Sequence, residues 1–375
     1  MSNAGSLRRR NPCDGDPRGV LSMIPIRMFV CCAFLLVSVS LAAQGGVPDA
    51  PSPSNEAGYV PLIAGGVGYI YKVDGGVPTL EPQINPVLLV PFGRHVLLES
   101  RTDFTGFFQR ENQTSGPYKG KVFTTVEYAQ LDWLADTHAT LVGGRYLLPF
   151  GLYNERLGPI WVKNLQDSPF TATIGTRTTG AGDGLMLRGV LAQTNKVSAQ
   201  YSAYFSVLSN IEQFGSARTA GGDASLFFPA KRLEIGGSYQ RFLQDRHINN
   251  GAAYVSWQPG SRALDVKAEY DGSYYGRGYW IESAYRLENT PLPSLLKKLQ
   301  AVGRVEQVFP QNGGGNGLPT VRTERFDLGL NYYVRDDLRL VSSYARSFSP
   351  TRDANIWNLG FTYRFSIPLW WGKTK

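Results

Sequence analysis

Apolar and polar residues alternate with a period of two along most of the chain from about residue 59 onward. The clearest segment is Val197–Val207, in which valine, alanine, tyrosine and phenylalanine take one set of alternate positions and mostly serine and glutamine take the other. In Leu264–Tyr270 the second set is entirely charged, with Asp265, Lys267 and Glu269. Because successive side chains of a strand point to opposite faces, the pattern predicts β-strands throughout.

The charged face of these strands decides between two environments. A charge at every second position is costly on a face buried in a dry core and costs little on a face that meets water. The opposite, apolar and aromatic face then has to contact lipid. Segments of about ten residues are long enough for a tilted strand to cross a bilayer. We therefore predict an all-β, transmembrane antiparallel β-barrel with lipid outside and water inside.

The connections support this architecture. Short turns such as Pro91–Gly93 and Arg335–Asp337 alternate with longer segments such as Arg110–Tyr118 and Pro310–Val321. Counting the extended segments gives about 16 strands, and a barrel must close because lipid offers no partner to an unpaired strand edge. Asn358–Phe365 should therefore pair with the strand that starts near Tyr59.

Two segments interrupt the regular pattern. The segment Val122–Trp133 changes phase around Tyr128, which predicts a bulge. The turn Glu288–Lys298 is long and is expected to contain a helical turn.

The amino-terminal part reads as a leader and signal peptide over residues 1–43. The apolar run Met28–Leu41 is preceded by Arg27 and followed by small residues, the order of a secretory signal. All three cysteines (Cys13, Cys31 and Cys32) lie in this part, which fits an exported protein without disulfides. We expect residues 44–57 to be a flexible periplasmic lead-in, residues 58–365 the barrel and residues 366–375 a carboxy-terminal extension.

The last predicted strand carries a second kind of information. Its order of residues resembles the terminal strand that the outer-membrane assembly machinery recognises, with Gly360, Tyr363 and Phe365 at the motif positions. The resemblance implies that this machinery is a partner.

A second resemblance lies in Gly144–Gly151, which reads Gly-Arg-Tyr-Leu-Leu-Pro-Phe-Gly. It is similar to the Gly, basic, aromatic, two variable positions, Pro-Phe-Gly segment of porins of the phosphate-selective O and P type. That family implies a 16-stranded, usually homotrimeric channel in the outer membrane of a Gram-negative bacterium, passing small anions or other hydrophilic solutes. In such porins the third outer loop folds inward and narrows the channel.

The longest connection, Pro149–Asp183, occupies the place of that third loop, and loops of this length are usually functional. Its charges and Arg145 are the candidate constriction: Arg145, Glu155, Arg156, Lys163, Asp167, Arg177 and Asp183. The candidate lumen wall is Glu99, Arg101, Asp103, Arg188, Asp265, Lys267, Glu269 and Arg304. These charges are mixed, whereas anion-selective members of the family line their pores with runs of arginine and lysine.

The sequence shows no pattern typical of a metal site, a catalytic site or a nucleic-acid-binding surface. The three histidines (His95, His138 and His247) lie in different segments without the spacing of metal ligands, so no metal site is predicted. No catalytic residues, cofactor or enzyme activity are expected, and the lack of a basic cluster with interleaved aromatics excludes nucleic acid as a partner. The modest net charge of +8 says little else about partners.

The sequence thus predicts an outer-membrane porin for passive diffusion of small hydrophilic solutes or ions, with the lipid bilayer as its surroundings. Two alternatives stay open. A closed or plugged barrel could act as an adhesin or scaffold, and a soluble exported β-sandwich could place the aromatic faces in a dry core.

Overall fold

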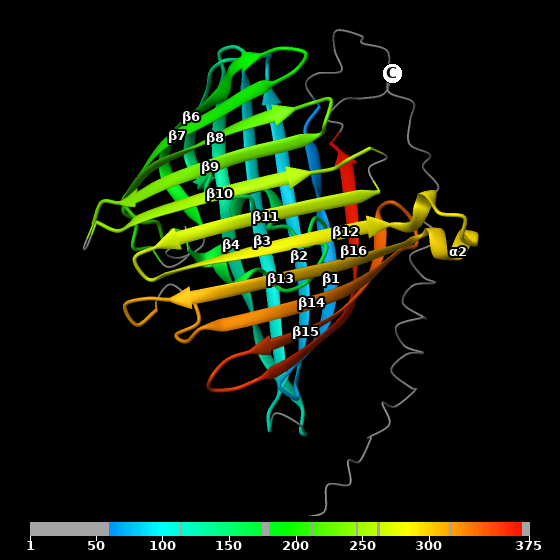
Figure 1. The fold of residues 1–375 in the computed structure, drawn as a ribbon. Coiled ribbons are helices and arrows are strands. Elements are labelled where there is room, and N and C mark those ends of the chain that lie inside the picture. Colours follow the sequence, from blue (N-terminus) through cyan, green and yellow to red (C-terminus); the bar gives the residue numbers. More distant parts are fainter. Residues whose placement is uncertain are drawn as a thin grey trace, which may run out of the picture. The chain divides into compact units, whose positions relative to one another are not determined.

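The computed structural model describes residues 60–112, 115–174, 180–211, 214–244, 247–260, 263–314 and 317–369. These residues form sixteen antiparallel strands in a closed ring, in which each strand pairs with its neighbours in sequence and β16 pairs with β1 (Figure 1). The predicted 16-strand barrel is confirmed, and the open two-layered sandwich is excluded. The expected leader, signal peptide and lead-in, and residues 370–375 of the expected extension, lie outside the described residues.

The strands vary in length around the ring. Their bounds are β1 Leu62–Asp74, β2 Val77–Phe92, β3 Val96–Arg110, β4 Tyr118–Leu134, β5 Thr140–Leu147, β6 Ala181–Gln193, β7 Ser198–Val207, β8 Thr219–Phe228, β9 Leu233–Phe242, β10 Asn249–Trp257, β11 Leu264–Ser273, β12 Gly276–Arg286, β13 Leu299–Pro310, β14 Thr323–Tyr333, β15 Leu338–Phe348 and β16 Ala354–Pro368.

The first and last strands form the seam that closes the ring. Gly65 pairs with Phe365 and Lys72 with Asn358, which is the predicted partnership. Strand β16 continues past Phe365 to Pro368, which pairs with Leu62. The first three residues of the expected carboxy-terminal extension therefore belong to the barrel.

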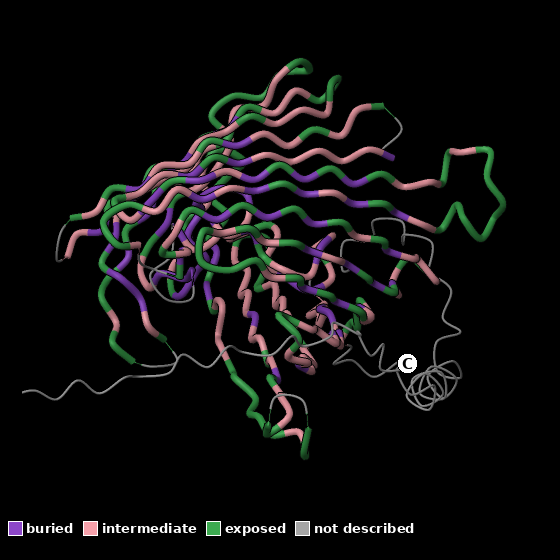
Figure 2. Tube along the Cα trace, turned by 60° about the horizontal axis from the view of Figure 1, so that its bottom comes forward, coloured by how far each residue is buried: buried purple, intermediate pink, exposed green. Residues whose placement is uncertain are grey.

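The two faces of the strands differ as the alternation predicts. On β16, Trp357 is 57% exposed on the outer side, whereas Asn358 is only 3% exposed on the inner side. Figure 2 shows this alternation of buried and exposed positions along many strands. Large apolar side chains on the exposed face and polar ones on the covered face reverse the order of a soluble domain, as expected of a barrel in lipid.

The connections differ at the two ends of the barrel. We call the end where β1 begins and β16 ends the turn end, and the opposite end the loop end. Turn-end connections are short except for residues 287–298, which contain the 3-10 helix Leu287–Asn289 and the helix α2 Ser294–Lys297, so the predicted helical turn is present. Loop-end connections are mostly longer, with two-residue exceptions at 75–76 and 274–275.

The predicted bulge is also present. Arg101 pairs with Tyr128 and Thr102 with Val126, so that Glu127 is the extra residue of β4. No helix among the described residues is long and apolar enough to cross a membrane.

Candidate functional site

The connection of residues 148–180, which we call the inner loop, leaves the barrel wall after β5, and its described residues 148–174 enter the lumen. Gly151 lies close to β11: a Cβ atom there would be 2.0 Å from Oε1 of Glu269, and its φ is +64°. Both features require glycine at this position. The Gly151 amide donates to the Ser238 hydroxyl at 2.9 Å and the Leu152 amide to the Glu269 carboxylate at 2.8 Å. These contacts hold the start of the inner loop against β9 and β11.

The middle of the inner loop is held through its backbone carbonyl groups. The guanidinium of Arg339 on β15 donates to the Lys163 carbonyl at 2.7 Å, and that of Arg304 on β13 donates to the Asp167 carbonyl at 2.8 Å. Arg325 on β14 donates to the Ser168 carbonyl at 2.6 Å. Three arginines of adjacent strands therefore replace the hydrogen bonds that water would give this segment.

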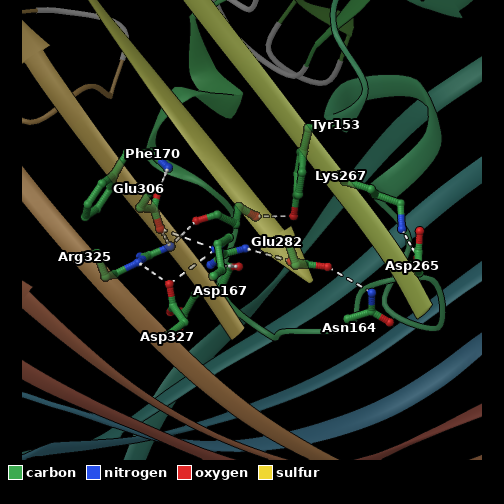
Figure 3. A network of polar contacts seen from close by, with 12 residues as sticks. Tyr153, Asn164, Asp167, Phe170, Asp265, Lys267, Glu282, Glu306, Arg325 and Asp327 are labelled. Carbon is green, nitrogen blue, oxygen red and sulfur yellow. Dashed lines mark hydrogen bonds and ion pairs between the residues drawn. The ribbon is translucent and has the colours of Figure 1, made fainter. Parts of the chain in front are cut away.

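A network of charged side chains on β12, β13 and β14 supports two of these arginines, Arg304 and Arg325 (Figure 3). Arg304 lies 3.3 Å from Asp327, 3.5 Å from Glu306 and 3.7 Å from Glu282, while Arg325 lies 2.5 Å from Glu306. All of these side chains are at most 10% exposed. Loss of one partner from such a buried network leaves a charge without compensation, which typically costs about 3–5 kcal/mol.

Apolar packing fixes the inner loop to the seam. Ile160 forms a buried cluster with Ile70 of β1 and Val341 of β15, and Trp161 packs against it. The wall has glycines at this contact: a Cβ atom on Gly66 would lie 2.1 Å from Cε3 of Trp161. The two small residues of β1, Gly66 and Gly68, thus make room for the loop.

The inner loop divides the lumen unequally. It covers the inner face of β10 to β16 and part of β9 and β1, where residues such as Tyr254, Glu306 and Asn331 are buried, and its Gly158 also approaches Arg101 of β3. The inner-facing charges of β2, β3 and β4, such as Glu81, Glu99 and Asp103, keep partly exposed side chains. The open passage therefore runs between the inner loop and the wall that begins at β2.

Two charged side chains of the inner loop face this passage. Lys163 interacts electrostatically with Glu81, Asp103 and Glu127 of the open wall. Glu155 lies 3.6 Å from Arg188 of β6, which also pairs with Asp132 at 2.6 Å. The narrow part of the passage is thus lined by charges from both sides.

Asp167 fastens the inner loop to the seam strands. Its carboxylate lies 2.5 Å from the Lys72 ammonium and accepts a hydrogen bond from the Asn358 amide at 2.7 Å. Burial alone would raise the pKa of the Asp167 carboxyl, but Lys72, Arg325 and Asn358 together hold this pKa below its usual range. The carboxylate is therefore charged at neutral pH.

The structure places the predicted wall residues on the inner face in two groups. Glu99, Asp103 and Arg188 are partly exposed along the open passage, Arg101 is buried beside Asp103 and Glu127, and Glu269 and Arg304 lie beneath the inner loop. Asp265 and Lys267 form an ion pair with each other on β11. Arg156 of the inner loop pairs with Glu234 on β9 at 2.8 Å.

Arg145 and Asp183 do not lie at the constriction. Val142 and Tyr146 of β5 and Met186 of β6 form a buried cluster on the inner face, so the alternation places Arg145 and Asp183 on the outer face with exposed Leu185. There they pair with each other at 3.0 Å, and Arg145 donates to the Gly215 carbonyl of the β7–β8 connection. The prediction that these two line the pore is wrong. A polar residue beside the point where the chain leaves the wall need not face the lumen.

The remaining candidates are placed as follows. Arg177 lies outside the described residues. On β16, Tyr363 and Phe365 share the outer side with Trp357, and Gly360 has the opposite orientation and pairs with Ile70 across the seam. Their role in assembly stays a prediction.

Sequence reasoning missed the residues that hold the inner loop, among them Lys72, Glu282, Arg325, Asp327 and Arg339. Their alternate positions along the strands fit the polar face, but nothing in the sequence shows which stretch of a distant loop each one contacts. Among the described residues, no group of three or more histidine, cysteine, aspartate or glutamate side chains is placed to hold a metal ion.

Comparison with solved structures shows the same fold in outer-membrane proteins. OmpT of Vibrio cholerae in its trimer form has a TM-score of 0.52 at 11% identity, over 82% of this chain and 99% of that one. An anion-selective porin of Comamonas acidovorans has a TM-score of 0.50 at 9% identity, over 82% and 98%. OprB of Pseudomonas putida has 0.50 at 10% identity, over 82% and 92%. No family profile and no curated protein sequence matches the chain. These likenesses show that the chain has the fold of outer-membrane porins.

Proposed function

We propose that this protein is an outer-membrane porin through which small hydrophilic solutes diffuse passively. The observation that carries the proposal is the unequal division of the lumen: the inner loop is fastened to one side and leaves the charged wall of β2, β3 and β4 partly exposed. Filtering is then steric and electrostatic and requires no covalent chemistry.

The wider setting belongs to the same proposal. The exposed apolar outer face fits a lipid bilayer, and the porin-like fold supports the outer membrane of a Gram-negative bacterium as its location. A homotrimer is proposed by analogy with the trimer form of OmpT. We also propose that the assembly machinery recognises Gly360, Tyr363 and Phe365. No enzyme activity is expected of the protein. The proposed relation to the O and P type porins rests on Gly144–Gly151, on the strand pattern and on the last strand.

Liposome swelling tests the proposal. Vesicles that contain the folded protein should swell in iso-osmotic solutions of small sugars, and the rate should fall steeply as the sugar becomes larger. Folding is checked by heat-modifiable migration on a gel. Folded protein that leaves the vesicles impermeable to every sugar would refute the channel and favour a plugged barrel.

A further inference from the structure

The charge in the passage differs in sign from the charge of the chain. The whole sequence carries a net charge of +8. Outside the exposed β3–β4 hairpin, which adds the inner-facing Lys119 and Lys121, the inner-facing residues of the open side and those lining the cavity at its loop end nevertheless carry more carboxylates than cations among the described residues. The carboxylates are Asp74, Glu81, Glu99, Asp103, Glu127, Asp132, Glu155, Asp223 and Glu234, and the cations are Lys72, Arg101, Arg156, Lys163, Arg188 and Arg352.

Most of those cations are already neutralised. Lys72 pairs with Asp167 of the inner loop, and Arg156 pairs with Glu234. Arg101 lies 3.3 Å from Asp103 and 3.6 Å from Glu127, so that one guanidinium serves two carboxylates. Arg188 is likewise shared between Asp132 and Glu155. An anion in the passage would find few cations free to attract it.

Four of these carboxylates, by contrast, have no cation within 4.0 Å among the described residues: Asp74, Glu81, Glu99 and Asp223. Asp223 accepts hydrogen bonds from Ser238 and Tyr254. Glu81 lies on β2 and Glu99 on β3. Glu81 lines a cavity of about 390 Å³ at the loop end together with Lys72, Thr79 and Phe107. Glu99 lies near the turn end of β3, where it interacts electrostatically with Asp132, Arg188 and Glu155. Carboxylates without an ion-pair partner therefore lie near both ends of the passage, Glu81 at the loop end and Glu99 near the turn end.

The wall under the inner loop shows that this excess is local. There, Glu282, Glu306 and Asp327 share Arg304, and Arg325 adds a second guanidinium to the last two. Glu282, Glu306 and Asp327 are thus compensated. Glu269 and Asp271 on β11 have no cation within 4.0 Å among the described residues, but they are buried beneath the inner loop and shielded by it. Only the carboxylates of the open wall act on a solute in transit.

Resting on the proposed channel function, we infer that the passage prefers cations and cationic solutes over anions. The selectivity arises from the summed field of the open wall and requires no discrete binding site, because a narrow passage with low-dielectric walls concentrates the counter-ions of its surface charge. Glu81 and Glu99 increase the preference for cations, and Lys163 opposes it from the inner loop.

The experiment is the reversal potential of single channels in planar bilayers under a tenfold gradient of potassium chloride. We expect potassium to be preferred over chloride by roughly fivefold, which corresponds to about 1 kcal/mol. The double variant Glu81→Gln/Glu99→Gln should lower the permeability ratio at least about twofold, and Lys163→Glu should raise it. Neither of the two glutamates is a partner in an ion pair, so their replacement leaves no buried charge uncompensated.

The control is Glu324→Gln, which removes the same charge from the outer face, where Glu324 pairs with Arg322 at 2.8 Å. It should leave the ratio unchanged. Channels that prefer chloride, or a ratio that responds equally to the control, would overturn the inferred selectivity and leave the channel proposal intact. Folded protein that produces no current steps would overturn the channel itself.

Discussion

The Lys72 ammonium on β1 lies 2.5 Å from the carboxylate of Asp167, which is 95 residues further along the chain at the middle of the inner loop. The same carboxylate accepts a hydrogen bond from Asn358 on β16. One side chain therefore joins the loop to both strands of the seam. Closure of the barrel and placement of the loop are linked through this contact.

Replacement of Asp167 should loosen the inner loop without unfolding the barrel. Hydrogen bonds to charged groups contribute about 1.5–3 kcal/mol each, and Asp167→Asn removes the charge that Lys72 and Arg325 compensate. We expect higher current noise and a higher mean conductance in single-channel recordings, with unchanged heat-modifiable migration. The matched control is Glu111→Gln, which weakens the exposed pair with Lys119 outside the lumen. Equal noise in the two variants would contradict the assigned anchor.

Acidification should reproduce that effect in the unchanged protein. The pKa of Asp167 is lower in the folded state than its unfolded value of about 3.9, so its contribution to anchoring is complete above that value and is lost as the pH falls through the folded pKa. Current noise recorded from pH 7 to pH 3 should stay flat at first and rise at the acid end. Asp167→Asn should lack this acid-induced component, and its persistence in the variant would rule out Asp167 as the titrating group.

A larger residue in place of Gly66 should push the inner loop into the passage. A Cβ atom at this position would lie 2.1 Å from the Trp161 ring, and the ring belongs to the packed cluster around Ile160. Gly66→Val is expected to lower single-channel conductance while the barrel still assembles. Gly272→Val serves as the control, because nothing lies within 4 Å of a Cβ atom there. Conductance that does not change in Gly66→Val would show that this contact does not position the loop.

The outer face offers a test of the lipid environment. Leu328 on β14 is 50% exposed and Val122 on the β3–β4 hairpin is 57% exposed, so the protein itself covers the two residues to a similar extent. In a bilayer, Leu328→Arg should cost about 2–4 kcal/mol if the position lies near the midplane. Val122→Arg should cost much less, because the hairpin residues around it are exposed on both faces and β4 pairs with β5 only from Ala129 onward.

Urea unfolding of the two variants in phospholipid bilayers measures this difference. If both arginines lower the free energy of unfolding equally, the exposed apolar outer face does not contact hydrocarbon. The proposed position of the barrel in the membrane would then be wrong.

The barrel could be predicted from the sequence because the alternation within each strand, taken by itself, shows which side chains face water and which face an apolar solvent. Asp265, Lys267 and Glu269 on one side of a single strand already separate water from an apolar solvent, and the same pattern recurs around the ring. The bulge at Glu127 was also readable, since an extra residue shifts the alternation at Tyr128.

The inner loop could not be predicted to the same depth. Its length and position indicated that it folds inward, but its contacts join residues more than one hundred positions apart, such as Phe170 with Glu306. Arg145 shows the limit of alternation near an irregular point: its charge suggested the lumen, whereas its register with Asp183 and the covering Phe214 ring place it outside.

The passage between the inner loop and the open wall is tested most directly by cysteine accessibility, since the predicted mature chain contains no cysteine. Glu81→Cys places a thiol on the open wall, and Ser343→Cys places one beneath the inner loop, where Ser343 is 7% exposed. A bulky methanethiosulfonate reagent added during single-channel recording should reduce the current of Glu81→Cys within minutes and leave that of Ser343→Cys unchanged. A block at Ser343→Cys with none at Glu81→Cys, or folded protein without any current, would contradict the account.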